Sequence, residues 1–282
     1  MKKIYLSFLF SFLLLTSCDN PLNQGLKTTD SKERLQFAKT LFENQKYSQV
    51  IQLTEILRKE FNKQPEFMEV VEMSAKSNLE LKNYGLAQGE YKELYDRAPR
   101  DSKAEHYYGM YILALSKDLP DYNLDQKNAD LFLSSLTSFK SQFPSSEKIA
   151  EFEKIEAQIK EGKIRKRFEL AKQYFDTQNY KAAIYDLENF MSEHPESSYI
   201  PECEKLIVES KSLLAISSVL AKKKDRILEA IDAQNNFVQK YPELKDWSDS
   251  YLTRLNLAEK ARQLEEESIK NREERFGIKP KN

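Results

Sequence analysis

The sequence predicts an all-α protein made of repeated helix pairs. Only 6 glycines occur among 282 residues, and hydrophobic residues make up 40% of the chain. Helix-favouring Leu, Lys, Glu, Gln and Ala are abundant. Prolines follow apolar helical patterns at spacings of roughly 34 to 51 residues, the range of helical repeats. We therefore expect a superhelical solenoid of about five helix hairpins, with a long shared helix near the middle.

The first 17 residues read as an export signal. Lys2 and Lys3 precede an apolar run from Ile4 to Thr16. As a helix this run would be roughly 20 Å long, which is short of the roughly 30 Å hydrocarbon core of a bilayer. Its length and basic start are typical of a cleaved signal.

Cys18 is the predicted lipidation site. Leu15-Thr16-Ser17-Cys18 resembles the box at which bacterial lipoproteins are cleaved and acylated. Two or more acyl chains anchor a protein durably, because each buried methylene contributes about 0.8 kcal/mol. The alternative is an incidental cysteine within an ordinary signal. With Cys18 lipidated, Cys203 has no partner, so we expect a buried thiol and no disulfide.

Residues 18–30 are polar and contain Pro21 and Gly25, which predicts a flexible tether between the anchor and the repeats. The repeats are expected in two parts, residues 31–144 and residues 145–282. The second part ends in a charged stretch, 246–275, that is expected to form a capping helix.

A short sequence motif that ends in proline marks the ends of the predicted hairpins. The prolines are Pro65, Pro99, Pro144, Pro195 and Pro242. Two large side chains at i and i+4 lie on one helix face and can pack together on a neighbouring helix, after which proline ends the helix. The phrase is clearest in Phe139-x3-Phe143, Phe190-x3-His194 and Phe237-x3-Tyr241.

A second phrase marks the turn inside the hairpins. Tyr47, Tyr84 and Tyr180 each follow an Asn or Gln near a turn, three residues before Val50, Ala87 and Ala183. We expect each tyrosine to wedge between two helices where the small or β-branched residue allows close approach. The two phrases together resemble the tetratricopeptide repeat. The longer spacings are attributed to a loop at 117–128 and to one helix over 146–177 that serves two repeats.

No motif for catalysis, cofactor or metal binding stands out. There is no GxxxxGK loop, and His106 and His194 lack metal-site spacing. The charge balance of 44 basic to 45 acidic residues argues against nucleic acid as a partner. We therefore expect no enzyme activity and no cofactor.

Tyr107, Tyr108 and Tyr111 cluster on one predicted helix in EHYYGMYILAL. Burial in the core is the favoured interpretation, because most aromatic residues of the chain fit repeat packing. The alternative is a peptide-contact surface, on which a remaining tyrosine would capture an extended or aromatic-ended segment.

The box, tether and repeats resemble the BamD family, the helical lipoproteins of the outer-membrane β-barrel assembly machinery. The likeness runs from Leu15 to about Ala258 and is most specific from 122–126 through 179–199. It implies a scaffold on the periplasmic face of the outer membrane. The C-terminal repeats would bind a BamA-like barrel-forming subunit, and the N-terminal repeats would receive unfolded outer-membrane proteins. It also implies contact with other lipoproteins of that complex.

Two other classes remain open. One is a different periplasmic repeat scaffold that coordinates the cell envelope. The other is a nutrient-binding lipoprotein beside an outer-membrane transporter. Asp19 favours retention at the inner membrane under the sorting rule of enteric bacteria, a rule that differs between lineages. The family resemblance favours the outer membrane.

Overall fold

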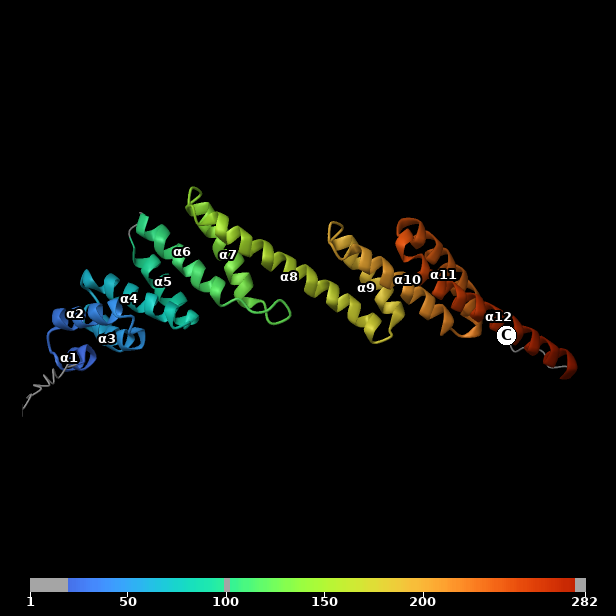
Figure 1. Cartoon of the computed structure of the whole chain (residues 1–282), viewed down its shortest axis with the longest axis horizontal. Coiled ribbons are helices and arrows are strands. Elements are labelled where there is room, and N and C mark those ends of the chain that lie inside the picture. Colours follow the sequence, from blue (N-terminus) through green and yellow to red (C-terminus); the bar gives the residue numbers. More distant parts are fainter. Residues whose placement is uncertain (1–19, 99–101, 277–282) are drawn as a thin grey trace, which may run out of the picture. The chain divides into compact units, whose positions relative to one another are not determined.

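The computed structural model describes residues 20–98 and 102–276. The predicted export signal, Cys18, Asp19 and Pro99 lie outside these ranges. The described part contains twelve α-helices and one short 3₁₀ helix, without any strand (Figure 1). The prediction of an all-α repeat protein is confirmed. The helices are α1 Pro21–Lys27, α2 Ser31–Glu43, α3 Tyr47–Glu60, α4 Glu66–Glu80, α5 Tyr84–Arg97, α6 Ser102–Lys117, α7 Lys127–Gln142, α8 Ile149–Asp176, α9 Tyr180–Glu193, α10 Ile200–Ile216, α11 Leu220–Lys240, η1 Pro242–Leu244 and α12 Lys245–Phe276.

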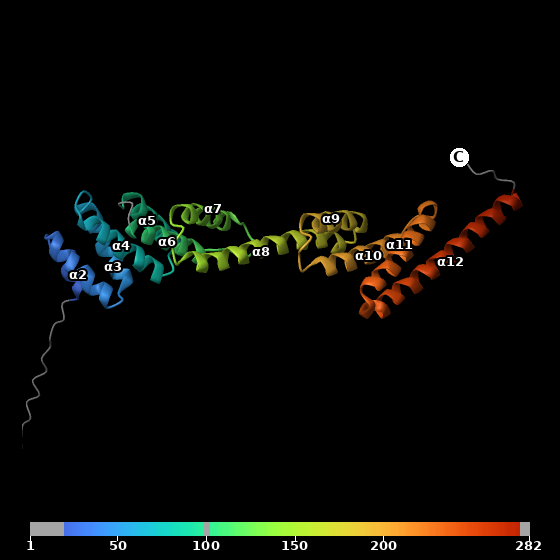
Figure 2. The same ribbon diagram turned by 90° about the horizontal axis from the view of Figure 1, so that it is seen from above.

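The chain divides into two compact units. Unit 1 comprises the chain up to Asp121 together with Asp125–Ile155, and unit 2 comprises Tyr122–Leu124 and the chain from Glu156 onward. The division falls within α8, whereas the sequence placed a boundary at 144. Within each unit, helices that follow one another along the chain pack in pairs (Figures 1 and 2). The long helix expected near the middle is α8, with 28 residues.

Three hairpin turns share one backbone geometry. Gln45, Lys82 and Gln178 adopt left-handed conformations, with φ of 57°, 62° and 62°. In each turn the next amide donates to a carbonyl five residues back: Lys46 to Leu41, Asn83 to Asn78, and Asn179 to Tyr174. This is the Schellman pattern, which satisfies the last carbonyls of the first helix and reverses the chain.

The predicted turn tyrosines begin the second helix of these hairpins. Tyr47 packs edge-on against Phe42 at 5.8 Å, and Tyr180 packs the same way against Phe175 at 6.0 Å. Tyr84 is half-buried at the start of α5. Three residues after each tyrosine, a fully buried side chain lies at the helix contact, namely Val50, Ala87 and Ala183.

The closing phrase lies at helix ends, as the sequence predicts. Phe143, His194 and Tyr241 are helix C-caps, and each amide donates to the carbonyl of the aromatic residue four positions earlier. The paired rings lie 4.8 to 5.3 Å apart in Phe139–Phe143, Phe190–His194 and Phe237–Tyr241. Pro144, Pro195 and Pro242 follow directly, and Pro65 caps the start of α4.

Aromatic side chains fill much of the core of unit 1. Tyr108 stacks on Tyr95 with centroids 4.5 Å apart and meets Phe139 edge-on at 5.6 Å. Phe152 of α8 then packs against Phe139 at 5.9 Å and against Phe132 at 6.4 Å. These contacts join α5, α6, α7 and the start of α8 by burial of large apolar surfaces.

Unit 2 has an apolar core that joins three consecutive helices. Phe168 of α8, Phe190 of α9 and Cys203 of α10 belong to one buried cluster. Between α10, α11 and α12 lies a fully buried polar chain. There the Ser248 hydroxyl donates to Gln234 Oε1 at 2.6 Å, and Gln234 Nε2 donates to Ser212 Oγ at 3.0 Å. Since each member has a partner, the chain fixes how these helices align without leaving an unpaired group.

The predicted tether is wrong from Pro21 onward, because Pro21–Lys27 forms α1. Asn20 caps this helix, and Gly25 is buried against α2 and α3. Arg34 of α2 is 6% exposed and holds the segment in place. It donates to the Gly25 carbonyl at 2.8 Å and also bonds the Thr28 carbonyl and Glu60. The polar composition of the segment predicted a flexible tether, but the helix cap, the packing of Gly25 and the bonds from Arg34 hold it against α2 and α3.

Two glycine substitutions test the packing of α1. A Cβ at Gly25 would lie 2.7 Å from Leu53 Cδ1, and Leu53 is fully buried. Gly25→Ala should therefore lower the free energy of unfolding by about 1 to 3 kcal/mol, the usual effect of overpacking. Gly89 in α5 has open space around it, so Gly89→Ala should raise the free energy by about 1 kcal/mol through helix propensity.

Urea unfolding followed by circular dichroism measures both changes. Hydrogen exchange should also show faster exchange in 21–27 for Gly25→Ala alone. Equal effects of the two substitutions would mean that α1 does not pack as described.

Candidate protein-binding grooves

Two grooves lie at equivalent positions in the repeats, one in each unit. The register follows from the helix ends, where the C-cap amides of Phe61, Ala98, His194 and Tyr241 donate to Leu57, Leu94, Phe190 and Phe237 respectively. Counting from these acceptors, α3 corresponds to α9 and α5 corresponds to α11. The equivalent pairs are Arg58 and Met191, Glu55 and Glu188, Glu90 and Ala233, Glu93 and Asn236, and Arg97 and Lys240.

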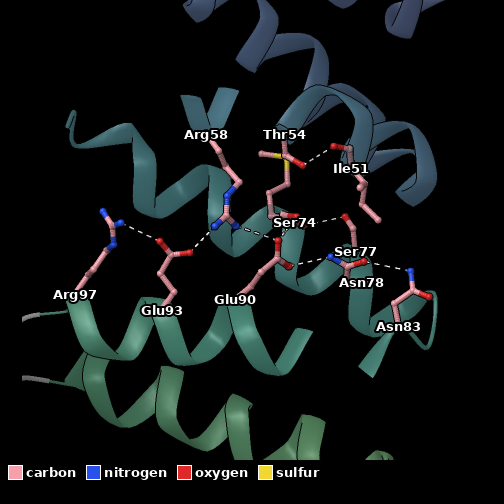
Figure 3. A network of polar contacts seen from close by, with 11 residues as sticks. Ile51, Thr54, Arg58, Ser74, Ser77, Asn78, Asn83, Glu90, Glu93 and Arg97 are labelled. Carbon is pink, nitrogen blue, oxygen red and sulfur yellow. Dashed lines mark hydrogen bonds and ion pairs between the residues drawn. The ribbon is translucent and has the colours of Figure 1, made fainter. Parts of the chain in front are cut away.

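The unit 1 groove runs between α3 and α5 and is bridged by ion pairs (Figure 3). Its volume is about 440 Å³. Arg58 Nη1 lies 3.1 Å from Glu90 Oε1, and its second amino group bonds Glu93. Glu93 in turn holds Arg97 at 2.9 Å. Charged side chains thus join the two helices across the groove.

Glu90 is the centre of this network. Its carboxylate accepts hydrogen bonds from Ser74 Oγ at 2.6 Å and from Asn78 Nδ2 at 2.9 Å, both on α4 (Figure 3). The side chain is only 15% exposed. Burial raises the pKa of Glu90, because the charged form loses solvation. The three donors offset part of that cost, so the network keeps a mostly buried carboxylate at the junction of α3, α4 and α5.

Phe67 closes one end of the unit 1 groove. Its ring lies 4.2 Å from the Arg97 guanidinium carbon and 5.8 Å from that of Arg58. Both distances are within the range of cation–π attraction. The lining of the groove therefore combines one aromatic ring with ion-paired charged side chains.

The unit 2 groove runs between α9 and α11 over α10 and lacks these bridges. Its volume is about 380 Å³. Met191 and Ala233 stand where unit 1 has Arg58 and Glu90, so neither ion-pairing partner is present. The apolar floor consists of Met191, Ile207, Val208, Ala233 and Phe237. We call this surface the α9–α11 groove.

The rim of the α9–α11 groove is polar and carries an acidic side chain without a counter-charge. Lys240 Nζ lies 2.5 Å from Glu204 Oε1, and that carboxylate raises the pKa of Lys240. The Tyr241 hydroxyl donates to the other oxygen of Glu204 at 2.6 Å. Glu188 is exposed and has no ion pair with any described residue. Asn236 completes the rim.

Within the described ranges, Ser210 lacks the carboxylate partner that the equivalent serine of unit 1 has. Counted back from the C-cap amides of Leu81 and Ser217, which donate to Ser77 and Leu213, it stands on α10 where Ser74 stands on α4. Ser74 donates to Glu90, whereas the buried Ser210 hydroxyl has no hydrogen-bond partner among the described residues. An unpaired buried hydroxyl costs about 1 to 3 kcal/mol. Unit 2 therefore has the serine donor of this contact but lacks the glutamate acceptor that unit 1 provides.

The tyrosines considered as peptide contacts are buried. Tyr107, Tyr108 and Tyr111 are 5%, 6% and 8% exposed. The hydroxyl of Tyr107 donates to Glu72 at 3.0 Å, and that of Tyr108 donates to the Ser135 carbonyl at 3.2 Å. These side chains belong to the core of unit 1, the interpretation that the sequence analysis favoured, and they offer little surface to a peptide.

The predicted packing residues fall into two groups. Ala183, Phe139, Phe190 and Phe237 are buried, while Tyr47, Tyr84, Tyr180, Phe143 and Tyr241 are half-buried at turns and helix ends. Cys203 is fully buried, and burial raises the pKa of its thiol to about 12. The sequence did not predict the grooves. Met191 and Ala233 look like ordinary helix residues, and nothing near them in the sequence indicates that the equivalent positions of unit 1 hold Arg58 and Glu90.

Removing Arg58 tests the unit 1 network. Arg58→Met leaves Glu90 without its cation, and the loss of a hydrogen bond to a charged group costs about 1.5 to 3 kcal/mol. The loss should be smaller at pH 4.5 than at pH 7.5, since a protonated Glu90 needs no counter-charge. Urea unfolding at both pH values measures it. Adding Glu90→Gln should recover part of the loss at pH 7.5, and a network without energetic weight would show neither effect.

Comparisons with known proteins identify no family for the chain. No protein-family profile matches it, and no curated protein matches it. Among solved structures, a thermophilic TPR protein of Thermus thermophilus is similar at 17% identity, covering 80% of this chain and 99% of that chain, with a TM-score of 0.32. A computationally designed self-assembling cyclic homooligomer is similar at 15% identity over 88% and 91% of the two chains, with a TM-score of 0.22. The description as a tetratricopeptide-like helical repeat rests on the hairpins themselves.

Proposed function

We propose that the chain is a lipid-anchored scaffold subunit of the outer-membrane β-barrel assembly complex. It acts by holding other polypeptides and carries out no reaction of its own. One observation supports this most directly: the C-terminal repeats present the apolar α9–α11 groove, whereas the equivalent groove in the N-terminal repeats is bridged by charged side chains. An apolar groove with a polar rim is the usual form of a protein-binding site.

In this proposal the two units bind different polypeptides. The repeats of 145–282 bind the BamA-like barrel-forming subunit. The repeats of 31–144 receive unfolded outer-membrane proteins. A groove of about 340 Å³ between α2 and α4 supports the second role. Phe42 and Met73 lie in it and offer apolar contact, and the Lys39–Glu69 ion pair at 2.7 Å lies at its edge.

The proposed anchor is Cys18, with the chain on the periplasmic face of the outer membrane. Within 20–98 and 102–276, none of the helices combines the length and apolar character needed to span a bilayer. Membrane attachment through the acylated cysteine would then place α1 close to the lipid surface, because few residues separate Cys18 from Pro21.

Depletion of the chain tests the proposed function. Folded barrels in the outer membrane should fall several-fold, while helical inner-membrane proteins stay constant. Heat-modifiable mobility of barrels on gels, which distinguishes folded from unfolded barrels, measures the change. The chain should also copurify with the barrel-forming subunit. Unchanged barrels after depletion would refute the proposal, and copurification with peptidoglycan enzymes or a transporter instead would favour one of the other two classes.

Cysteine substitutions test the anchor. Cys18→Ala should abolish labelling of the chain by radioactive palmitate and release it from membranes. Cys203→Ala is the matched control and should leave labelling unchanged, since Cys203 is fully buried. Fractionation against inner- and outer-membrane markers then reports where the anchored chain resides. Labelling that survives Cys18→Ala would contradict the assignment.

A further inference from the structure

We propose that the α9–α11 groove takes an amphipathic helix of a partner protein, with a Lys or Arg of that helix paired to Glu188. The proposal rests on the proposed function only in treating the C-terminal repeats as a partner-binding surface. It adds the form and the charge of the segment that is bound.

The apolar floor favours a helix over an extended strand. Met191, Ile207 and Phe237 offer no hydrogen-bonding side chains, and polar groups occur only on the rim. A strand laid on this floor would bury backbone N–H and C=O groups without partners. A helix satisfies its backbone internally and can place Leu, Ile, Met or Phe side chains at i, i+3, i+4 and i+7 against the floor.

The rim determines the charge of the partner. Of the rim carboxylates, Glu204 is bonded by Lys240 and by the Tyr241 hydroxyl. Glu188 has no such partner in the described part of the chain and stands exposed beside Met191. A basic side chain on the flank of the bound helix would complete the rim. An acidic one would face Glu188 and Glu204 and be repelled.

The unit 1 groove shows how charged side chains bridge the equivalent surface in the other unit. Arg58 and Glu90 bridge α3 to α5, and Ser74 donates to the same carboxylate. The combined change Met191→Arg with Ala233→Glu copies this arrangement into unit 2, where Ser210 already stands in the position of Ser74. The introduced pair should place charged side chains across the apolar floor of the α9–α11 groove and weaken the binding of an apolar helix face while the fold is kept.

Photo-crosslinking in living cells tests the proposal with the full-length chain. A photo-reactive amino acid in place of the exposed rim residue Asn236 reports on the α9–α11 groove, and one in place of the exposed Asn62 reports on the unit 1 groove. Adducts from position 236 should map by mass spectrometry to one segment with helical apolar spacing and a Lys or Arg on its flank. Position 62 should not yield that segment.

Charge exchange then tests the pairing. Glu188→Lys should reduce the adduct roughly fivefold or more, and replacing the mapped basic residue of the partner by Glu should restore it. Glu55→Lys changes the equivalent exposed position of unit 1 and should leave the adduct unchanged. The combined change at Met191 and Ala233 should also reduce the adduct. Circular dichroism melting of each purified variant shows whether the fold is kept.

The outcomes separate this proposal from the proposed function. Adducts to a segment with strand-like alternation, or adducts indifferent to Glu188→Lys, would overturn it even when the barrel-forming subunit still copurifies. A charge-exchanged helix that belongs to a protein outside barrel assembly would support it and refute the proposed function. Absence of any adduct from position 236 would overturn it directly.

Discussion

The structure depends on one constraint: a helix hairpin has more apolar surface than its own two helices can cover. Val50, Ala87 and Ala183 let the paired helices approach closely, and the remaining face of each hairpin is buried by the next helix along the chain. In unit 2 this produces a buried cluster with members from three successive helices, among them Phe168 of α8, Phe190 of α9 and Cys203 of α10. The stability of the chain therefore comes largely from contacts between helices that are adjacent in sequence, as in other helical repeats.

The same constraint leaves grooves between helices two apart, such as α3 and α5 or α9 and α11, and their side chains differ. Between α3 and α5 the surface is bridged by charged side chains that meet at Glu90. Between α9 and α11 the positions of the main ion pair hold Met191 and Ala233, and the floor stays apolar. Two side-chain positions thus distinguish a surface bridged by ion pairs from one with an apolar floor. Binding function in such a fold resides in the differences between repeats.

Much of the fold was predictable from the sequence, because the turns and helix ends use the same residue types each time. The tyrosines at the starts of α3, α5 and α9, and the aromatic pairs before Pro144, Pro195 and Pro242, lie where the phrases predicted them. The α1 helix was missed: Asn20 and Pro21 form a helix start, but the packing of Gly25 on α2 and α3 and the bonds from Arg34 to two carbonyls involve residues distant in the sequence. The grooves were not predictable. The side chains of two other helices determine which apolar residues of a groove remain accessible. The helical periodicity of one segment does not reveal those side chains.

The recurring turn has a consequence for how the chain reaches its native state. Gln45, Lys82 and Gln178 occupy a left-handed conformation that β-carbon sterics disfavour, yet the carbonyl pairing around them is complete. Each turn joins helices that are adjacent along the chain, so closing one requires only a short loop of polypeptide and little entropy. Local closure of this kind favours folding that nucleates at any of the three hairpins and spreads outward, which gives the chain several independent starting points.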